Sequence, residues 1–143
     1  MSTEENRTIV RRGFEEGMNQ KDLDVFSELL APNYVNHNMP TPAPGPEGFK
    51  QVMAMFVNGF PDFHITVEDT IAEGDKVATR GYFTGTHTGE FMNIPATGKQ
   101  VKVSYIDIWR MENGKAVENW VQMDQLSMLQ QLGVVPQQEG APS

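Results

Sequence analysis

The fold is decided by residues 101–124, which read VKVSYIDIWRMENGKAVENWVQMD. Apolar and polar residues largely alternate on both sides of Asn113-Gly114, and this dipeptide between alternating runs is the strongest short-range signal for a β-hairpin. The stretch therefore predicts two antiparallel strands, over about 101–111 and 116–124. A two-residue loop would pair Glu112 with Lys115, which fixes the residues that lie opposite each other.

Side chains directly opposite each other in an antiparallel pair share one face of the sheet. Counting back from the turn gives a face rich in aromatic and acidic side chains: Val103, Tyr105, Asp107, Trp109, Glu118, Trp120, Gln122 and Asp124. That face is either the wet exterior or the wall of a pocket. The other face is mostly apolar and fits internal packing or an interface between subunits. A three-residue loop would reverse the assignment.

The remaining chain divides into a helical first half and a strand-rich second half. Ser2 and Glu5 predict a capping box at the start of the first helix. The prolines of residues 39–46 predict a loop, and Pro46 suits the first turn of a helix. The expected elements are helices over about 3–19, after Asp22 and over 46–59, a short strand over 33–38, strands over 63–68 and 77–87, and a last helix closed by Gly133.

Helices that precede an antiparallel meander, instead of alternating with strands, are typical of an α+β fold. A curved antiparallel sheet wrapped around N-terminal helices forms a cone-shaped barrel, and the mouth of a cone is a natural site for a ligand. We expect residues 1–135 to form a single domain and residues 136–143 to form a flexible C-terminal tail.

Composition excludes several classes of function. The net charge of −8 argues against binding to nucleic acid or to anionic membrane surfaces. Apolar runs fall well short of the roughly 20 residues that a membrane span needs, and the polar N-terminus lacks the features of a signal peptide. Cysteine is absent, which excludes disulfides, thiolate metal sites and a cysteine nucleophile. We therefore expect a cytoplasmic protein.

The aromatic and acidic face would support proton transfer if it lined a pocket. Burial would raise the pKa of its carboxyl groups, so that one of them could exchange protons near neutral pH. Asp124 has an alternative role, because a helix starts directly after it and Asp is a preferred N-cap. His37 and His87 could be structural or could face the pocket. The spacing of these residues is not that of a metal site, and we expect none.

Seven stretches resemble the SnoaL-like polyketide cyclase family, within the nuclear transport factor 2-like superfamily. They are residues 34–37 (YVNH), 60–62 (FPD), 71–77 (IAEGDKV), 85–91 (GTHTGEF), 95–99 (PATGK), 114–124 (GKAVENWVQMD) and 131–133 (QLG). The resemblance extends from about Glu4 to Gly133.

This resemblance implies a cone-shaped α+β barrel that forms a homodimer and binds a small hydrophobic molecule. Characterised members close a ring by an intramolecular aldol reaction, without a metal or an organic cofactor. The resemblance places the acid/base aspartate on Asp124, with His37 and His87 as further catalytic candidates near the pocket. The expected substrate-binding residues are Tyr34, Tyr105, Asp107, Trp109, Trp120 and Gln122.

Two alternatives to a cyclase-like acid/base enzyme stay open at this point. The chain could be a non-catalytic module that binds a small molecule, in which case Asp124 only caps its helix. It could also be an epoxide hydrolase or isomerase of the same fold, with Asp107 and Asp124 positioning a water molecule.

Overall fold

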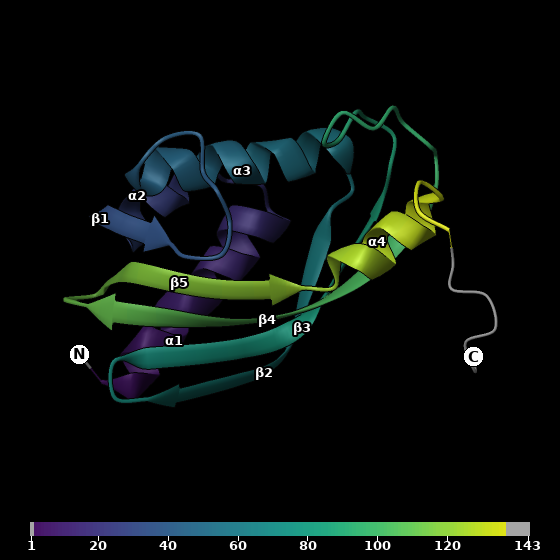
Figure 1. The fold of residues 1–143 in the computed structure, drawn as a ribbon. Coiled ribbons are helices and arrows are strands. Elements are labelled where there is room, and N and C mark those ends of the chain that lie inside the picture. Colours follow the sequence, from purple (N-terminus) through teal and green to yellow (C-terminus); the bar gives the residue numbers. More distant parts are fainter. Residues whose placement is uncertain (1, 137–143) are drawn as a thin grey trace.

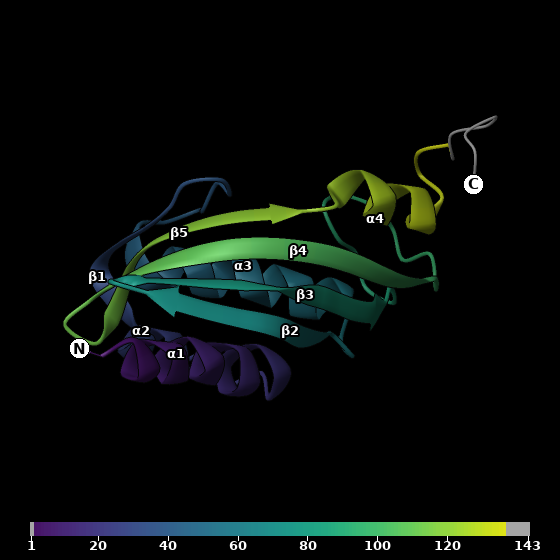
Figure 2. The same cartoon turned by 90° about the horizontal axis from the view of Figure 1, so that it is seen from below.

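The structure, a computed structural model of the 143-residue chain, describes residues 2–136. Figure 1 shows helices packed along one curved sheet, and Figure 2 shows the same arrangement from below. The helical elements are α1 (Thr3–Arg12), the π-helical segment η1 (Gly13–Asn19), α2 (Val25–Leu29), α3 (Gly45–Gly59) and α4 (Gln125–Leu132). Within the described residues, no helix is both long and apolar enough to cross a lipid bilayer.

One sheet of five strands runs in the order β1-β5-β4-β3-β2. Its four consecutive strands β2 to β5 are antiparallel, whereas β1 pairs in parallel with β5. A parallel pair needs a long connection, and here α3 and three strands separate the two partners. The α+β prediction, with a curved sheet around N-terminal helices, is confirmed, although the sheet is unclosed and one edge pair is parallel. The strands are β1 (Leu30–Asn36), β2 (His64–Glu73), β3 (Lys76–Thr86), β4 (Gln100–Glu112) and β5 (Lys115–Met123).

The predicted helix ends agree with the structure except at the second helix. The backbone N–H of Glu5 donates to Ser2 Oγ at 3.0 Å, and the Ser2 N–H donates to Glu5 Oε1 at 3.2 Å, which completes the predicted capping box. The first helix reaches Asn19 as expected, but its last seven residues are π-helical. Asp24, not Asp22, occupies the N-cap of α2, because the Asp22 carbonyl already closes a turn onto the Val25 N–H. The predicted C-terminal tail lies outside the described residues from position 137 onward.

A β-bulge in β5 reverses the predicted side-chain facing of the hairpin. Glu112 pairs with Lys115 as predicted, and Met111 pairs with Ala116, but Arg110 pairs with Glu118. Val117 is therefore the extra residue, and it is buried next to the buried Ala116. One extra residue moves every later side chain of β5 to the other face. The predicted grouping of β4 residues with Glu118, Trp120, Gln122 and Asp124 is thus wrong.

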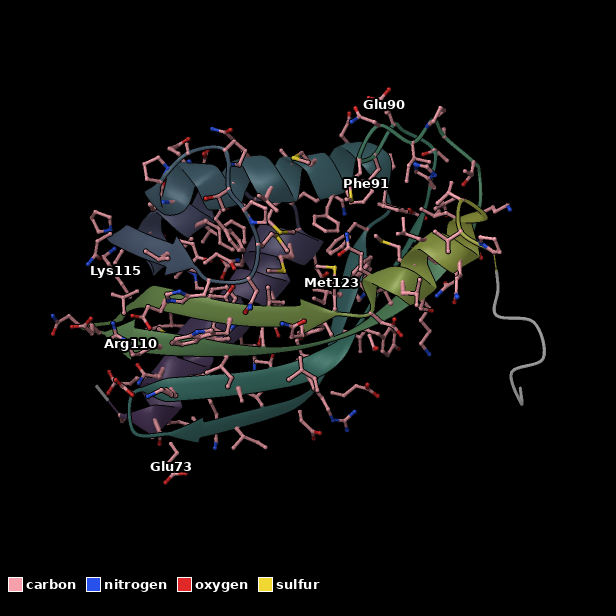
Figure 3. All side chains as sticks on the ribbon, viewed as in Figure 1. Glu73, Glu90, Phe91, Arg110, Lys115 and Met123 are labelled. Carbon is pink, nitrogen blue, oxygen red and sulfur yellow. The ribbon has the colours of Figure 1, made fainter. Side chains whose placement is uncertain are left out.

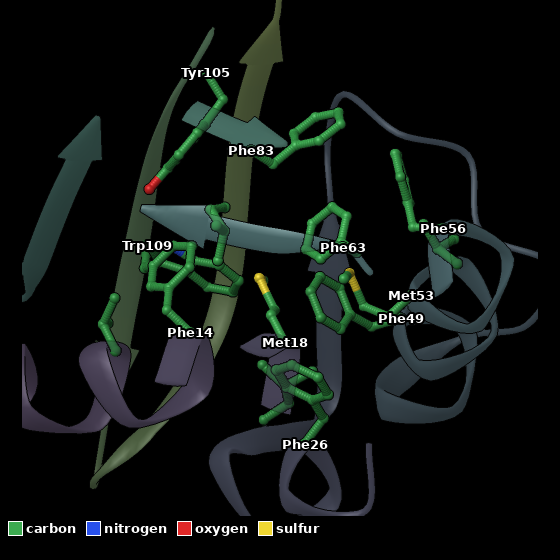
Figure 4. Packing of buried hydrophobic residues seen from close by; sticks show 14 of the residues in the cluster. Phe14, Met18, Phe26, Phe49, Met53, Phe56, Phe63, Phe83, Tyr105 and Trp109 are labelled. Carbon is green, nitrogen blue, oxygen red and sulfur yellow. The ribbon is translucent and has the colours of Figure 1, made fainter. Parts of the chain in front are cut away.

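The inner face of the sheet packs against the helices and forms the core. On β4 this face holds every second residue, from Val101 to Met111. On β5 it holds Asn119, Val121 and Met123, which follow the bulge. Figure 4 shows the aromatic packing between sheet and helices, and the Trp109 ring lies 6.3 Å from that of Phe14 and 6.0 Å from that of Phe49.

Candidate functional site

An inner cavity of about 60 Å³ lies between the helices and the inner face of the sheet. Its lining is mainly aromatic and methionine side chains, with few polar groups, among them Asp107, Asn119 and Asn36. Such a chamber, apolar with a few convergent polar groups, is typical of sites for small molecules.

An outer groove of about 670 Å³ adjoins this cavity, and the two share a wall. The proline-rich segment after β1 forms one side of the groove, and Phe91 and Met92 form another. Figure 3 shows Phe91 and Met123 toward the end of the molecule where α3 approaches α4, far from Arg110 at the hairpin. The residues common to cavity and groove are Met39, Val52, Phe56, Val121 and Met123.

Asp107 is the carboxylate of the inner cavity. It lies on the inner face of β4 and is only 4% exposed. Thr79, directly opposite on β3, donates a hydrogen bond to Asp107 Oδ1 with an oxygen–oxygen distance of 2.5 Å. The Tyr105 hydroxyl lies 3.1 Å from Thr79 Oγ1. Because the single Thr79 proton goes to Asp107, Tyr105 donates to Thr79, and the three side chains form a chain of hydrogen bonds ending on the carboxylate.

Burial is the main cause of the shifted pKa values of Asp107 and Tyr105. Burial raises the pKa of Asp107 from its ordinary value of 3.8 to about 7, and the hydrogen bond from Thr79 opposes part of that rise. Burial also raises the pKa of Tyr105 to about 12, so its hydroxyl remains protonated at neutral pH. A pKa near the working pH suits a group that both takes and returns a proton.

A second polar network meets the cavity at Asn119, which is 2% exposed on β5. Asn119 Oδ1 accepts hydrogen bonds from Asn36 Nδ2 at 3.2 Å and from the Tyr34 hydroxyl at 3.4 Å, and its amide donates to the Ile108 carbonyl. Asn36 Nδ2 carries two hydrogens and uses one of them here. The Trp109 side chain also opposes the rise in the pKa of Asp107, although its buried Nε1 group forms no well-aligned hydrogen bond among the described residues.

The predicted site residues divide between the two faces of the sheet. Tyr34, Tyr105, Asp107 and Trp109 lie on the inner side, and all four are buried. Trp120 lies on the outer face, where the His37 ring stacks on it at 4.9 Å between centroids. His37 Nε2 is 3.8 Å from the Glu118 carboxylate, and Gln122 is exposed on the same strand, although it borders the outer groove.

Asp124 lies outside the inner cavity and caps α4. Its side chain is exposed, and Oδ1 accepts a hydrogen bond from the Ser127 N–H at 3.1 Å. Where the inner cavity meets the outer groove, β5 contributes Val121, which lines both, and Asp124 lines neither. The structure therefore shows the alternative role predicted for Asp124, that of an N-cap.

We expect Asp124→Ala to lower the free energy of unfolding by about 1 kcal/mol, because Asp is among the best N-caps. Asp124→Asn should retain most of that stability, since its amide oxygen can accept the same hydrogen bond. Chemical denaturation at neutral pH measures both variants. Equal losses for Ala and Asn would contradict the capping role.

His87 lies immediately after β3 and is fully buried. Its Nδ1 lies 2.9 Å from Thr97 Oγ1 and accepts the Thr97 backbone N–H at 3.2 Å. It does not line the inner cavity or the outer groove. The structure thus separates the three predicted catalytic residues: Asp124 is at a helix cap, His37 is on the outer face and His87 is under a loop.

Sequence reasoning missed two important polar residues, Thr79 and Asn119. Thr79 could not be paired with Asp107, because the irregular loop between β3 and β4 gives no turn from which to count. Regular pairing from the Asn113-Gly114 turn puts Asn119 on the mostly apolar face of the predicted hairpin, whereas the bulge brings it to the cavity. Consecutive buried positions at Ala116 and Val117 are the local trace of that bulge.

Comparison with known proteins agrees with this architecture. The sequence matches the model of the SnoaL-like polyketide cyclase family over residues 8–132. The chain belongs to this family. Solved relatives share its cone fold, which confirms the fold that the sequence resemblance implied. No curated protein sequence matches the chain.

Three solved structures show how close the likeness is. TsrD from Streptomyces laurentii is 27% identical with a TM-score of 0.86, over 94% of this chain and 99% of its own. IdmH from Streptomyces antibioticus, a proposed polyketide cyclase, is 34% identical with a TM-score of 0.76, over 88% and 96%. AclR from Streptomyces galilaeus, a proposed hydroxylase, is 27% identical with a TM-score of 0.85, over 97% and 87%.

Proposed function

We propose that this protein is an acid/base enzyme, independent of cofactors, that acts on a small hydrophobic substrate bearing a carbonyl group. The observation that carries the proposal is the buried carboxyl group of Asp107, which lines an apolar cavity and has a pKa of about 7. Family membership supports cyclase-type chemistry. Asp107 takes the role that the family resemblance had suggested for Asp124, because Asp107 alone of the two lies in the cavity lining.

The proposed reaction begins with removal of a proton from the carbon next to the carbonyl. The C–H bond breaks, its electron pair forms the enolate, and the proton moves to the Asp107 carboxylate. In an aldol closure the enolate carbon then bonds to a second carbonyl carbon of the same molecule. The new alkoxide takes the proton back from Asp107, so that the carboxylate is regenerated and no other reactant is needed.

Two groups of the cavity suit this reaction. Asn36 Nδ2 retains a second hydrogen that can donate to the developing enolate oxygen, which is where electrostatic stabilisation contributes most. Thr79 donates to Asp107 Oδ1 and, with Tyr105 behind it, keeps the carboxylate oriented. The aromatic lining makes the surroundings of the reacting carbon apolar, which strengthens the electrostatic interactions with the developing charge.

The sizes of the two chambers indicate how a substrate would lie. A dry cavity of about 150 Å³ is known to hold benzene, whereas the inner cavity measures about 60 Å³. A slim carbonyl end fits there, while the body of the substrate fits the outer groove of about 670 Å³. The methionines of the groove, including Met39, Met55 and Met92, adapt to apolar bodies of different shape.

Deuterium exchange into a simple ketone tests the proposal. Benzylacetone has a phenyl body and a methyl ketone end, and proton NMR in D₂O follows loss of its α-hydrogens. The catalysed rate should rise with pH through about 7 and level off above, because the carboxylate of Asp107 is the active base. A catalysed rate that does not change between about pH 5 and pH 8 would contradict Asp107 as the base.

The same assay separates the enzyme from a binding module. A binding module would bind benzylacetone, measured by its perturbation of NMR signals from the groove, and would leave the exchange rate at the buffer level at every pH.

A further inference from the structure

His87 is fully buried, but it has no part in the proposed proton transfer. Its ring packs against Phe60 at 5.3 Å between centroids, and only its Nδ1 atom has side-chain hydrogen bonds. Nε2 is buried with no partner among the described residues. Polar side chains at such positions need a structural or functional explanation.

The hydrogen bonds of Nδ1 define which tautomer the ring adopts. A backbone N–H can only donate, so the Thr97 N–H requires a lone pair on Nδ1. Because Nδ1 then carries no proton, the Thr97 hydroxyl 2.9 Å away also donates to it. The neutral ring therefore carries its proton on Nε2, and His87 acts here as an acceptor for Thr97.

These contacts close the base of the 88–98 loop. The His87 N–H donates to the Lys99 carbonyl at 2.9 Å, and the Gly98 N–H donates to the His87 carbonyl at 2.8 Å. The first residues of the loop are held by α3, where the Gly59 carbonyl accepts from the N–H groups of Thr88 and Gly89. The loop is thus fixed at its base, where His87 follows β3 and bonds to the residues that lead into β4.

The tip of the 88–98 loop forms a wall of the outer groove. Phe91 is 4% exposed, and its ring lies 5.0 Å from that of Phe56. Met92 and Asn93 have φ values of 51° and 63°, a left-handed conformation that costs energy in residues other than glycine. Backbone hydrogen bonds between Phe91 and Ile94 close this turn, and the anchors at the base of the loop position the closed turn against the groove.

We propose that His87 is a positioning residue: through Nδ1 it holds Thr97 and the 88–98 loop, and so sets the groove wall formed by Phe91 and Met92. His87 holds the loop and so shapes the groove that binds the substrate, and it does not touch the reacting atoms. The inference is independent of the proton transfer proposed for Asp107.

Three substitutions test this role. His87→Phe keeps an aromatic ring and removes the acceptor, whereas His87→Asn places an amide oxygen where Nδ1 lies and retains the acceptor. His64→Phe is the matched control, because His64 is exposed on β2. Hydrogen–deuterium exchange measures opening of the loop, and fluorescence of anilinonaphthalene sulfonate measures ligand affinity.

His87→Phe should speed amide exchange across residues 88–98 by about tenfold, the effect of losing a buried hydrogen-bond acceptor. It should weaken binding of the dye severalfold and leave exchange in β4 and β5 unchanged. His87→Asn should restore most of both properties, and His64→Phe should change neither. Wild-type exchange in His87→Phe, or equal effects of Phe and Asn, would overturn the proposal.

Thr97→Val keeps the test decisive if His87→Phe fails to fold. It removes only the hydroxyl that lies 2.9 Å from Nδ1. The proposal predicts faster exchange in the same loop, and an unchanged rate would overturn it. Asp107→Asn should leave loop exchange at the wild-type rate, which separates this inference from the proposed chemistry.

Discussion

Asp107→Asn is expected to lower the rate of benzylacetone deuteration by a factor of about 10² to 10⁴, the usual contribution of a positioned acid/base group. The amide has nearly the same shape as the carboxylate and can still accept the Thr79 hydrogen bond, so the cavity should keep its form. Its nitrogen cannot take a proton from carbon at any pH in the stable range of the protein. After the buffer rate is subtracted, the remaining rate should therefore lack the rise near pH 7.

Glu118→Gln is the matched control for this loss of rate. Glu118 lies on the outer face of the same sheet, where it forms an ion pair with Arg110 at 3.2 Å. Its substitution should leave deuteration within about twofold of the wild type, because no part of the cavity changes. Full activity in Asp107→Asn would remove Asp107 from the mechanism and return attention to Asp124.

The same Asp107→Asn variant is expected to be more stable than the wild type in alkaline solution, by about 2 kcal/mol at about pH 8. Folding raises the pKa of Asp107 from an ordinary 3.8 to about 7, so the folded chain holds a proton over a range in which the unfolded chain has lost it. The contribution of Asp107 to the free energy of unfolding of the wild type is therefore fully present below about pH 4. It falls as the pH rises toward 7 and stays low above that. The amide of the variant does not ionise, so its burial causes no such loss of stability as the pH rises.

Urea denaturation at a series of pH values measures the difference. The gain from Asp107→Asn should shrink toward zero or reverse near pH 4, where the wild-type carboxyl is protonated. Asp62→Asn gives the opposite sign, because hydrogen bonds from Thr86 lower the pKa of Asp62. That variant should be less stable than wild type near pH 7 and approach it as pH falls. A gain for Asp107→Asn that is equal at all pH values would contradict an ionisable group in the cavity.

Local patterns in the sequence predict most of the fold. The capping box at Ser2, the entry of α3 near Pro46 and the Asn113-Gly114 turn each depend on residues a few positions apart. Alternation on β4 correctly placed Tyr105, Asp107 and Trp109 on one face. The π-helical segment η1 and the parallel pairing of β1 depend on distant packing, such as the Phe26 ring against Gly17, and have no comparable local signal.

The candidate site was only half predictable because of one extra residue. Because of the bulge at Val117, the inner face of β5 holds Asn119, Val121 and Met123 in place of the predicted Trp120, Gln122 and Asp124. In the sequence, Ala116-Val117 has no feature that distinguishes it from regular strand residues. Thr79 reaches Asp107 only through the register of β3 on β4. The family match supports the cyclase assignment for the chain as a whole, while the homodimer implied by the resemblance stays a prediction.

The most direct test of this account is the titration of the Asp107 side-chain carboxyl carbon by NMR, assigned by comparison with Asp107→Asn. We predict a midpoint near 7, because the carboxyl group is buried with only neutral hydrogen-bond donors identified beside it. A midpoint near the ordinary value of about 3.9 would contradict that prediction, because it would show that burial in the apolar cavity does not raise the pKa of Asp107.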